Sequence, residues 1–121
     1  MSRLQHPTEK QQAGQIGEEA ALAYLLGQGL TLVERNYRCR QGEIDLIMRH
    51  HGTLVFIEVR KRKKQAFGGA IASVTKAKQK RLIHAAHSFL QRFQQSPECR
   101  FDMIAIDGEE LAWLQNVIET V

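Results

Sequence analysis

The chain has 121 residues, of which 43% are hydrophobic and 25% are charged, a composition that is typical of one soluble globular domain and excludes global disorder. The longest apolar run, from Ala20 to Leu26, is too short to span a bilayer, and the polar N-terminus lacks a signal-peptide core, so we expect one cytoplasmic domain over residues 1–121 without membrane association. The net charge is only +4, but all 13 acidic residues lie outside residues 59–97 and ten of the 17 basic residues lie inside them.

The first predicted element is a helix. Residues 1–7 are expected to form a flexible N-terminus, and Thr8-Glu9-Lys10-Gln11 then matches a capping box. Apolar residues follow at helical spacing and predict a helix that ends near Gly27 or Gly29. Residues 30–35 predict the first strand.

Two apolar segments, residues 42–47 and residues 54–60, predict the next two strands. Between them, His51 and Gly52 suit the central positions of a type I′ hairpin turn, because glycine tolerates the positive φ that the second position requires. Such a turn fixes the register of the two strands and brings His50 opposite Thr53.

This register places Asp45 opposite Glu58 and Glu43 opposite Arg60, with the members of each pair on the same face. Facing carboxylates are destabilising unless something neutralises them, and Mg²⁺ or Mn²⁺ held by carboxylate oxygens would do so. Arg60 points to the same side as Glu58 and could stand beside a scissile phosphate. The alternative is a surface ion-pair cluster in which Arg60 pairs with Glu43.

The first helix carries two acidic residues, Glu18 and Glu19, opposite part of its apolar stripe. Either could reach a site on the sheet. On spacing alone, both are more often solvated residues than ligands.

The second half of the chain predicts a glycine-rich loop at residues 67–70 and a long helix that Ser73 or Thr75 caps and that reaches about Phe93. Residues 101–106 and 110–114 predict two further strands. The order of helix, three strands, helix and two strands indicates an α/β or α+β fold with a helix on each face of the sheet.

Basic residues on both sides of the predicted loop point to a polyanionic partner, most simply nucleic acid, although a solvated basic surface is the alternative. Several of them occupy the start of the second helix, where the helix macrodipole disfavours cations, and this placement suggests use in phosphate binding. The predicted nucleic-acid contacts are Lys61, Arg62, Lys63, Lys64, Lys76, Lys78, Lys80 and Arg81.

Several motifs occur in a fixed order along the chain. They are Gly14-x-x-Gly17-Glu18-x-x-Ala21, Glu34-Arg35-Asn36-Tyr37-Arg38, Gly42-Glu43-Ile44-Asp45-Leu46-Ile47, Val55-Phe56-Ile57-Glu58-Val59, Phe67-Gly68, Lys78 and Arg100-Phe101-Asp102. This succession resembles the YraN family of bacterial proteins. The family is similar to the PD-(D/E)XK, restriction-endonuclease-like superfamily and, within it, to archaeal Holliday-junction resolvases.

The resemblance implies a mixed central sheet flanked by helices and metal-dependent cleavage of nucleic acid. It makes Asp45 and Glu58 metal carboxylates and Glu18 the helix-borne acid that completes the site. The superfamily lysine falls on Arg60. Guanidinium remains protonated, so Arg60 could stabilise phosphate charge but could not accept a proton.

The leading hypothesis is therefore a Mg²⁺- or Mn²⁺-dependent endonuclease-like protein that acts on DNA, including branched or processing intermediates. The alternative is a non-catalytic nucleic-acid-binding module whose nuclease site is degenerate at Arg60. A third interpretation is a protein-interaction adaptor. DNA is favoured over RNA, and a homodimer is considered alongside a monomer.

Overall fold

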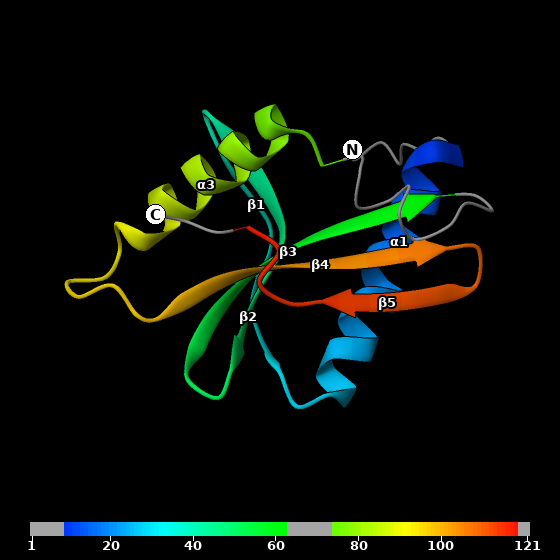
Figure 1. The fold of residues 1–121 in the computed structure, drawn as a ribbon, viewed down its shortest axis with the longest axis horizontal. Coiled ribbons are helices and arrows are strands. Elements are labelled where there is room, and N and C mark those ends of the chain that lie inside the picture. The colour runs from blue at the N-terminus through cyan, green and yellow to red at the C-terminus, as the bar shows by residue number, and fades with distance from the viewer. Residues whose placement is uncertain (1–8, 63–73, 119–121) are drawn as a thin grey trace, which may run out of the picture.

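The computed structural model describes residues 9–62 and 74–118 of the chain (Figure 1). The order of their elements confirms the predicted α/β fold class, with a helix, three strands, a helix and two strands. The elements are α1 (Glu9–Gly27), β1 (Thr31–Cys39), β2 (Gly42–His50), β3 (Thr53–Arg62), α3 (Lys76–Leu90), β4 (Cys99–Asp107) and β5 (Glu110–Leu114). The predictions for residues 1–7, the loop at 67–70, Ser73, Lys63 and Lys64 lie outside the described residues.

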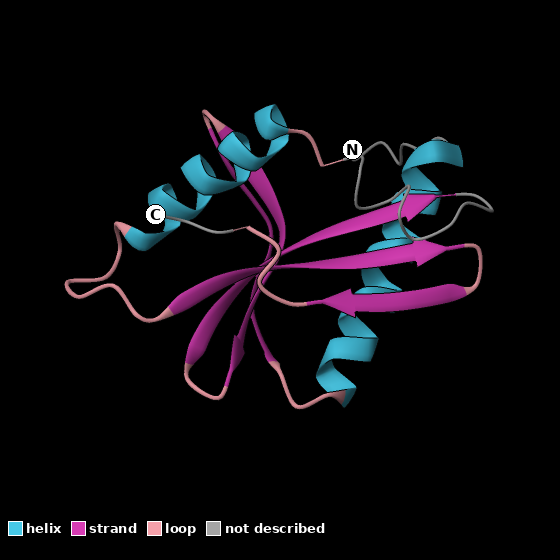
Figure 2. Ribbon diagram, viewed as in Figure 1, coloured by secondary structure: helices cyan, strands magenta, loops and turns pink. Residues whose placement is uncertain are grey.

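The strands form one mixed sheet in the order β1-β2-β3-β4-β5 (Figure 2). β3 and β4 are parallel, and each other neighbouring pair is antiparallel. Parallel neighbours require a crossover connection, and α3 lies within the connection from β3 to β4.

The two helices cover opposite faces of the sheet, each over its own apolar cluster. Under α3, Phe89 packs with Phe56 of β3 and Phe101 of β4. Under α1, Leu25 packs with Ile57 of β3 and other apolar residues of the inner strands. Since β3 buries side chains on both faces, it is a central strand of the core, and residues near its end lie between two layers.

The β2–β3 hairpin has the predicted turn and register. His51 and Gly52 both have positive φ, at 51° and 87°, as a type I′ turn requires. The ladder runs from His50 opposite Thr53 to Leu46 opposite Ile57. It ends there, so neither of the expected pairs, Asp45 with Glu58 and Glu43 with Arg60, is part of the ladder. On the other side of β2, Glu43 pairs with Arg38 of β1.

The ladder ends because β2 changes sides at Asp45. Ile44 and Ile47 both pack in the cluster under α3, whereas Leu46 packs in the cluster under α1. In a regular strand, residues three apart point to opposite faces. The alternation is therefore broken between Ile44 and Ile47, and β2 separates from β3 at this level.

The neighbouring strand β1 changes sides at the same level. Glu34 forms an ion pair with Arg92, which follows α3, and Tyr37 hydrogen-bonds Ser88 of α3 at 2.6 Å. Between them, Asn36 has a φ of 52°, the left-handed conformation that asparagine tolerates better than most residues. β1 also continues to Cys39, beyond the predicted end at residue 35, and α3 ends at Leu90 rather than Phe93.

Candidate active site

Asp45 lies where β2 and β3 separate. Its Oδ2 accepts a hydrogen bond of 2.8 Å from the backbone N–H of Val59. The carboxylate thus replaces a main-chain acceptor that the shortened ladder no longer supplies. This bond holds the side chain of Asp45 against β3, next to Glu58.

Glu58 is a buried acid, only 9% exposed, on the α3 side of β3. Burial raises its pKa to about 8, and the negative charge of Asp45 and a hydrogen bond shared with Asp45 act in the same direction. Burial also raises the pKa of Asp45, although the Val59 N–H and the bond with Glu58 oppose the rise. Without a bound metal ion, the pair of Asp45 and Glu58 therefore retains one proton near neutral pH.

Two basic side chains contact the same oxygen of Glu58. Nη1 of Arg60 and Nζ of Lys78 each lie 3.6 Å from Oε2. Both cations lower the pKa of Glu58, but they do not offset its burial and the neighbouring acid. Arg60 comes from β3 and Lys78 from the first turn of α3, so the site joins two elements.

Glu18 approaches the acid pair from α1, on the other side of the sheet. Its pKa is raised by burial and by the negative charge of Asp45, and lowered by Arg35 and by a hydrogen bond with the side chain of Asn36. The break in alternation at Asn36 and Asp45 explains how an acid from the α1 layer comes near acids on the α3 side.

The donor chemistry of these acids suits a hard divalent cation, because carboxylate oxygens are the ligands that Mg²⁺ and Mn²⁺ prefer. Within residues 9–62 and 74–118, however, no three His, Cys, Asp or Glu side chains lie close enough to hold a metal ion together. Asp45 and Glu58 are adjacent as metal ligands would be, and Glu18 is near but not within a common ligand set.

The predicted nucleic-acid contacts that the structure describes do not all lie on the side of the acid pair. Lys76, Lys80 and Arg81 are exposed on α3, whereas Lys78 is half-buried against Glu58. Lys61 is exposed on the opposite face of β3 from Arg60, and its stem lies beside Gly17 of α1. Arg62 ends β3.

Residues 17–106 match the model of a family described as uncharacterised protein family UPF0102. The chain belongs to the UPF0102 family. This confirms the resemblance to the YraN family, which is a member of the PD-(D/E)XK-like nuclease superfamily. The matched segment includes Glu18, Asp45, Glu58 and Lys78.

Curated relatives support this membership along nearly the whole chain. A UPF0102 protein of Herminiimonas arsenicoxydans is 61% identical over 113 residues, covering 93% of this chain and 91% of that protein. Another from Janthinobacterium is 58% identical over 116 residues, covering 96% and 94%. A third, from Cupriavidus metallidurans, is 53% identical over 107 residues, covering 88% and 80%. None of the helices in the described part of the chain has the length and apolarity needed to cross a membrane.

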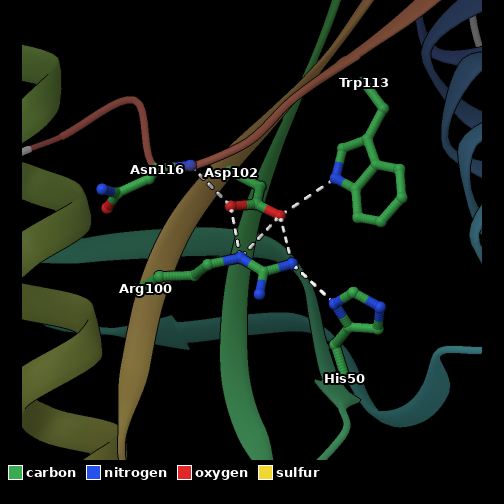
Figure 3. Close-up of polar contacts among 5 residues, drawn as sticks. All are labelled: His50, Arg100, Asp102, Trp113 and Asn116. Atoms are coloured by element: carbon green, nitrogen blue, oxygen red, sulfur yellow. Dashed lines mark hydrogen bonds and ion pairs between the residues drawn. The ribbon is translucent and has the colours of Figure 1, made fainter.

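This UPF0102 chain also contains a second polar cluster, around Asp102 of β4 (Figure 3). The carboxylate accepts hydrogen bonds from Nε and Nη2 of Arg100, from Nε1 of Trp113 at 2.9 Å and from the backbone N–H of Asn116 at 2.9 Å. Nη2 of Arg100 also bonds Nδ1 of His50, whose pKa is lowered by burial and by the charge of Arg100. These bonds satisfy the buried charge, so the cluster joins β2, β4 and β5 rather than offering open ligand positions.

Sequence reasoning gave no site role to Asn36, and it placed Lys78 among nucleic-acid contacts rather than at the acid pair. A signal for Asn36 was present, because an asparagine inside a strand pattern marks a point where left-handed backbone is tolerated. The contact between Lys78 and Glu58 depends on how α3 packs, which no local pattern specifies.

Proposed function

We propose that this UPF0102 protein is a cytoplasmic, Mg²⁺- or Mn²⁺-dependent endonuclease that acts on DNA, including branched or processing intermediates. The observation that carries the proposal is the buried acid pair, in which the pKa of Glu58 is raised to about 8 beside Asp45. A buried pair of acids costs folding free energy, and such perturbed groups are concentrated at functional sites.

In this proposal Asp45 and Glu58 hold the divalent cation, and Glu18 assists directly or through water. When bound, the cation would supply charge neutralisation at the phosphate and a water that ionises more readily. Arg60 stabilises negative charge that develops on the phosphate. Hydrolysis adds water to phosphorus and breaks one P–O ester bond, and the released oxygen takes a proton to give a hydroxyl beside a phosphate monoester.

The exposed basic residues would position the DNA backbone. Lys76, Lys80 and Arg81 lie on α3, at the helix end that also carries Lys78 to the acid pair. Their contacts with phosphates would carry little sequence information, because phosphate contacts position a duplex without reading its bases. This agrees with a substrate recognised by its shape.

The second candidate is a non-catalytic nucleic-acid-binding module. The observation that favours it is that Glu58 faces the guanidinium of Arg60, while the described residues bring no three metal ligands together. An acid held by ion pairs can be a structural residue of a site that no longer cleaves. Metal-dependent turnover distinguishes the two candidates.

A cleavage screen tests the proposed endonuclease. Branched, flap, duplex and single-stranded DNA would be incubated with purified protein and Mg²⁺ or Mn²⁺, with Asp45→Asn as the control. We expect cleavage of at least one substrate, lost with EDTA and reduced at least about 100-fold in the variant. Salt-sensitive binding without cleavage of any substrate would favour the non-catalytic module instead. Homodimer formation stays a prediction that sedimentation would test.

A further inference from the structure

The ammonium of Lys78 is the feature of the site that the proposed roles do not use. Its Nζ lies 3.6 Å from Oε2 of Glu58, the oxygen that Arg60 also contacts at 3.6 Å. Both separations exceed the 2.7–3.2 Å of a good N–H···O hydrogen bond. The Lys78 side chain is 34% exposed, compared with 24% for Arg60. Lys78 therefore reaches the acid pair and remains more exposed to solvent than Arg60.

The position of Lys78 is fixed by the start of α3. Thr75 caps the helix, and its Oγ1 accepts a hydrogen bond from the backbone N–H of Lys78 at 3.2 Å. The first turn contains no acidic residue, so the positive end of the helix macrodipole is not neutralised there. Gly42, where β2 begins, packs directly against the backbone of Arg81, three residues after Lys78, and keeps this part of α3 close to the sheet.

We propose that Lys78 contacts the scissile phosphate of the substrate and is a catalytic residue of the site, in addition to Arg60. This inference rests on the proposed nuclease function. It names α3 as the element that binds the scissile phosphate beside the acid pair. Lys78 transfers no proton in this proposal. Its compact ammonium donates hydrogen bonds to a phosphate oxygen and stabilises the charge that develops as the P–O bond breaks.

The two cations differ in what they can do. Arg60 lies in β3 two residues after Glu58, so its side chain points to the same face of the sheet as Glu58. Lys78 approaches from a different element and has three rotatable donors, which allow it to exchange Glu58 for a phosphate oxygen. Its neighbours Lys76 and Lys80 are exposed and contact no carboxylate within the described residues. We therefore assign Lys76 and Lys80 to flanking phosphates of the DNA backbone, and Lys78 to the scissile phosphate.

The test compares Lys78→Met with Lys80→Met, which removes the same charge two residues away. Under single-turnover conditions with saturating DNA and Mn²⁺, we expect Lys78→Met to lower the cleavage rate about 100-fold. Lys80→Met should mainly weaken binding and lower that rate less than about threefold, because it would contact only a flanking phosphate. Equal rate losses in the two variants would overturn the proposal.

Rescue gives a second readout that a merely structural role would not produce. The double variant with Arg60→Lys and Lys78→Met should cleave about tenfold faster than Lys78→Met alone. The reason is that Arg60→Lys places an ammonium beside the same oxygen of Glu58. Thermal melts of all variants check folding. No recovery in a double variant that melts like the wild type would count against the proposed role.

The proposal can be judged even if the wild-type protein cleaves nothing, a result that would defeat the endonuclease function itself. The affinity for a short duplex would then be measured with Ca²⁺ in place of Mg²⁺. Lys78→Met should weaken binding at least about threefold more than Lys80→Met, because Lys78 would contact the phosphate nearest the acid pair. An equal or smaller loss for Lys78→Met would show that Lys78 contacts no phosphate at this site.

Discussion

At the scale of single residues, Asn36 positions acidic residues of the candidate site although it is not itself an acid. Its left-handed backbone accompanies the change of sides in β1, and its side chain hydrogen-bonds Glu18. Directly beside it in the sheet, Asp45 makes its bond to Val59 rather than extending the ladder. One backbone conformation thus connects an acid from α1 with an acid from β2.

Substitutions at Asn36 separate its backbone from its side chain. Asn36→Ala should lower the free energy of unfolding by about 1–2 kcal/mol, the cost of a left-handed conformation with a Cβ that has no compensating hydrogen bond. Asn36→Gly should be more stable than Asn36→Ala by about 1 kcal/mol, because glycine adopts positive φ readily. Urea denaturation measures both. At an ordinary strand position alanine is the more stable of the two, so that order here would contradict the role given to Asn36.

At the scale of elements, the sequence predicted the hairpin well because its determinants are local. His51 and Gly52 specify the turn, and the turn specifies the register as far as Leu46. The end of the ladder at Asp45 could not be predicted in this way, since it depends on the conformation of β1, a separate strand. The same limit applies to Lys78, whose helix start was predicted from Thr75 but whose contact with Glu58 depends on packing.

The docking of α3 onto β2 leads to a prediction at Gly42. A Cβ there would overlap the backbone oxygen of Arg81, so Gly42→Ala must displace α3 at this residue. We expect a loss of about 1–3 kcal/mol in unfolding free energy, as for other overpacked positions. Gly27→Ala is the matched control, because a Cβ at Gly27 meets no atom within 4 Å and alanine favours a helix. If Gly42→Ala were as stable as Gly27→Ala, the close contact would not position α3.

At the scale of the whole molecule, the acidic and the basic residues of the site occupy different places. The acid pair lies inside, where β2 and β3 part between the two helical layers, and basic residues of α3 lie exposed around it. The sequence shows the acid-free segment over residues 59–97 directly. It could not predict the burial of Glu58 or how far its pKa is raised, because both arise from the assembled layers.

The raised pKa of Glu58 predicts how the stability of the metal-free protein depends on pH. The ordinary pKa of Glu58 is 4.5 and the folded value is about 8, so between these values the folded state holds a proton that the unfolded state has lost. The stabilisation is therefore complete below pH 4.5 and is lost as the pH rises towards 8. Glu18 and Asp45, whose pKa values are also raised, act in the same direction.

Other groups limit the range in which this effect can be measured. The pKa of His50 is lowered from 6.5, so its effect has the opposite sign and appears only as the pH falls below about that value. The pKa of the Cys99 thiol is raised from 9.0, which matters only at higher pH. Between pH 6.5 and 8, loss of the Glu58 proton is the main expected change.

Urea denaturation in EDTA across this range should show the unfolding free energy falling with pH, by at most about 1.4 kcal/mol per pH unit, which is roughly 2 kcal/mol in total. Glu58→Gln should flatten this dependence, because glutamine has no carboxyl proton to lose. The stability of the variant relative to the wild type should therefore be greatest at pH 8. Mg²⁺ or Mn²⁺ in place of EDTA should restore stability to the wild type at pH 8 but not to Glu58→Gln, since a cation that binds the folded site adds its binding free energy to folding. A wild-type protein with the same pH slope as Glu58→Gln would show that Glu58 ionises normally, and the acid pair would then lose its support as a metal site.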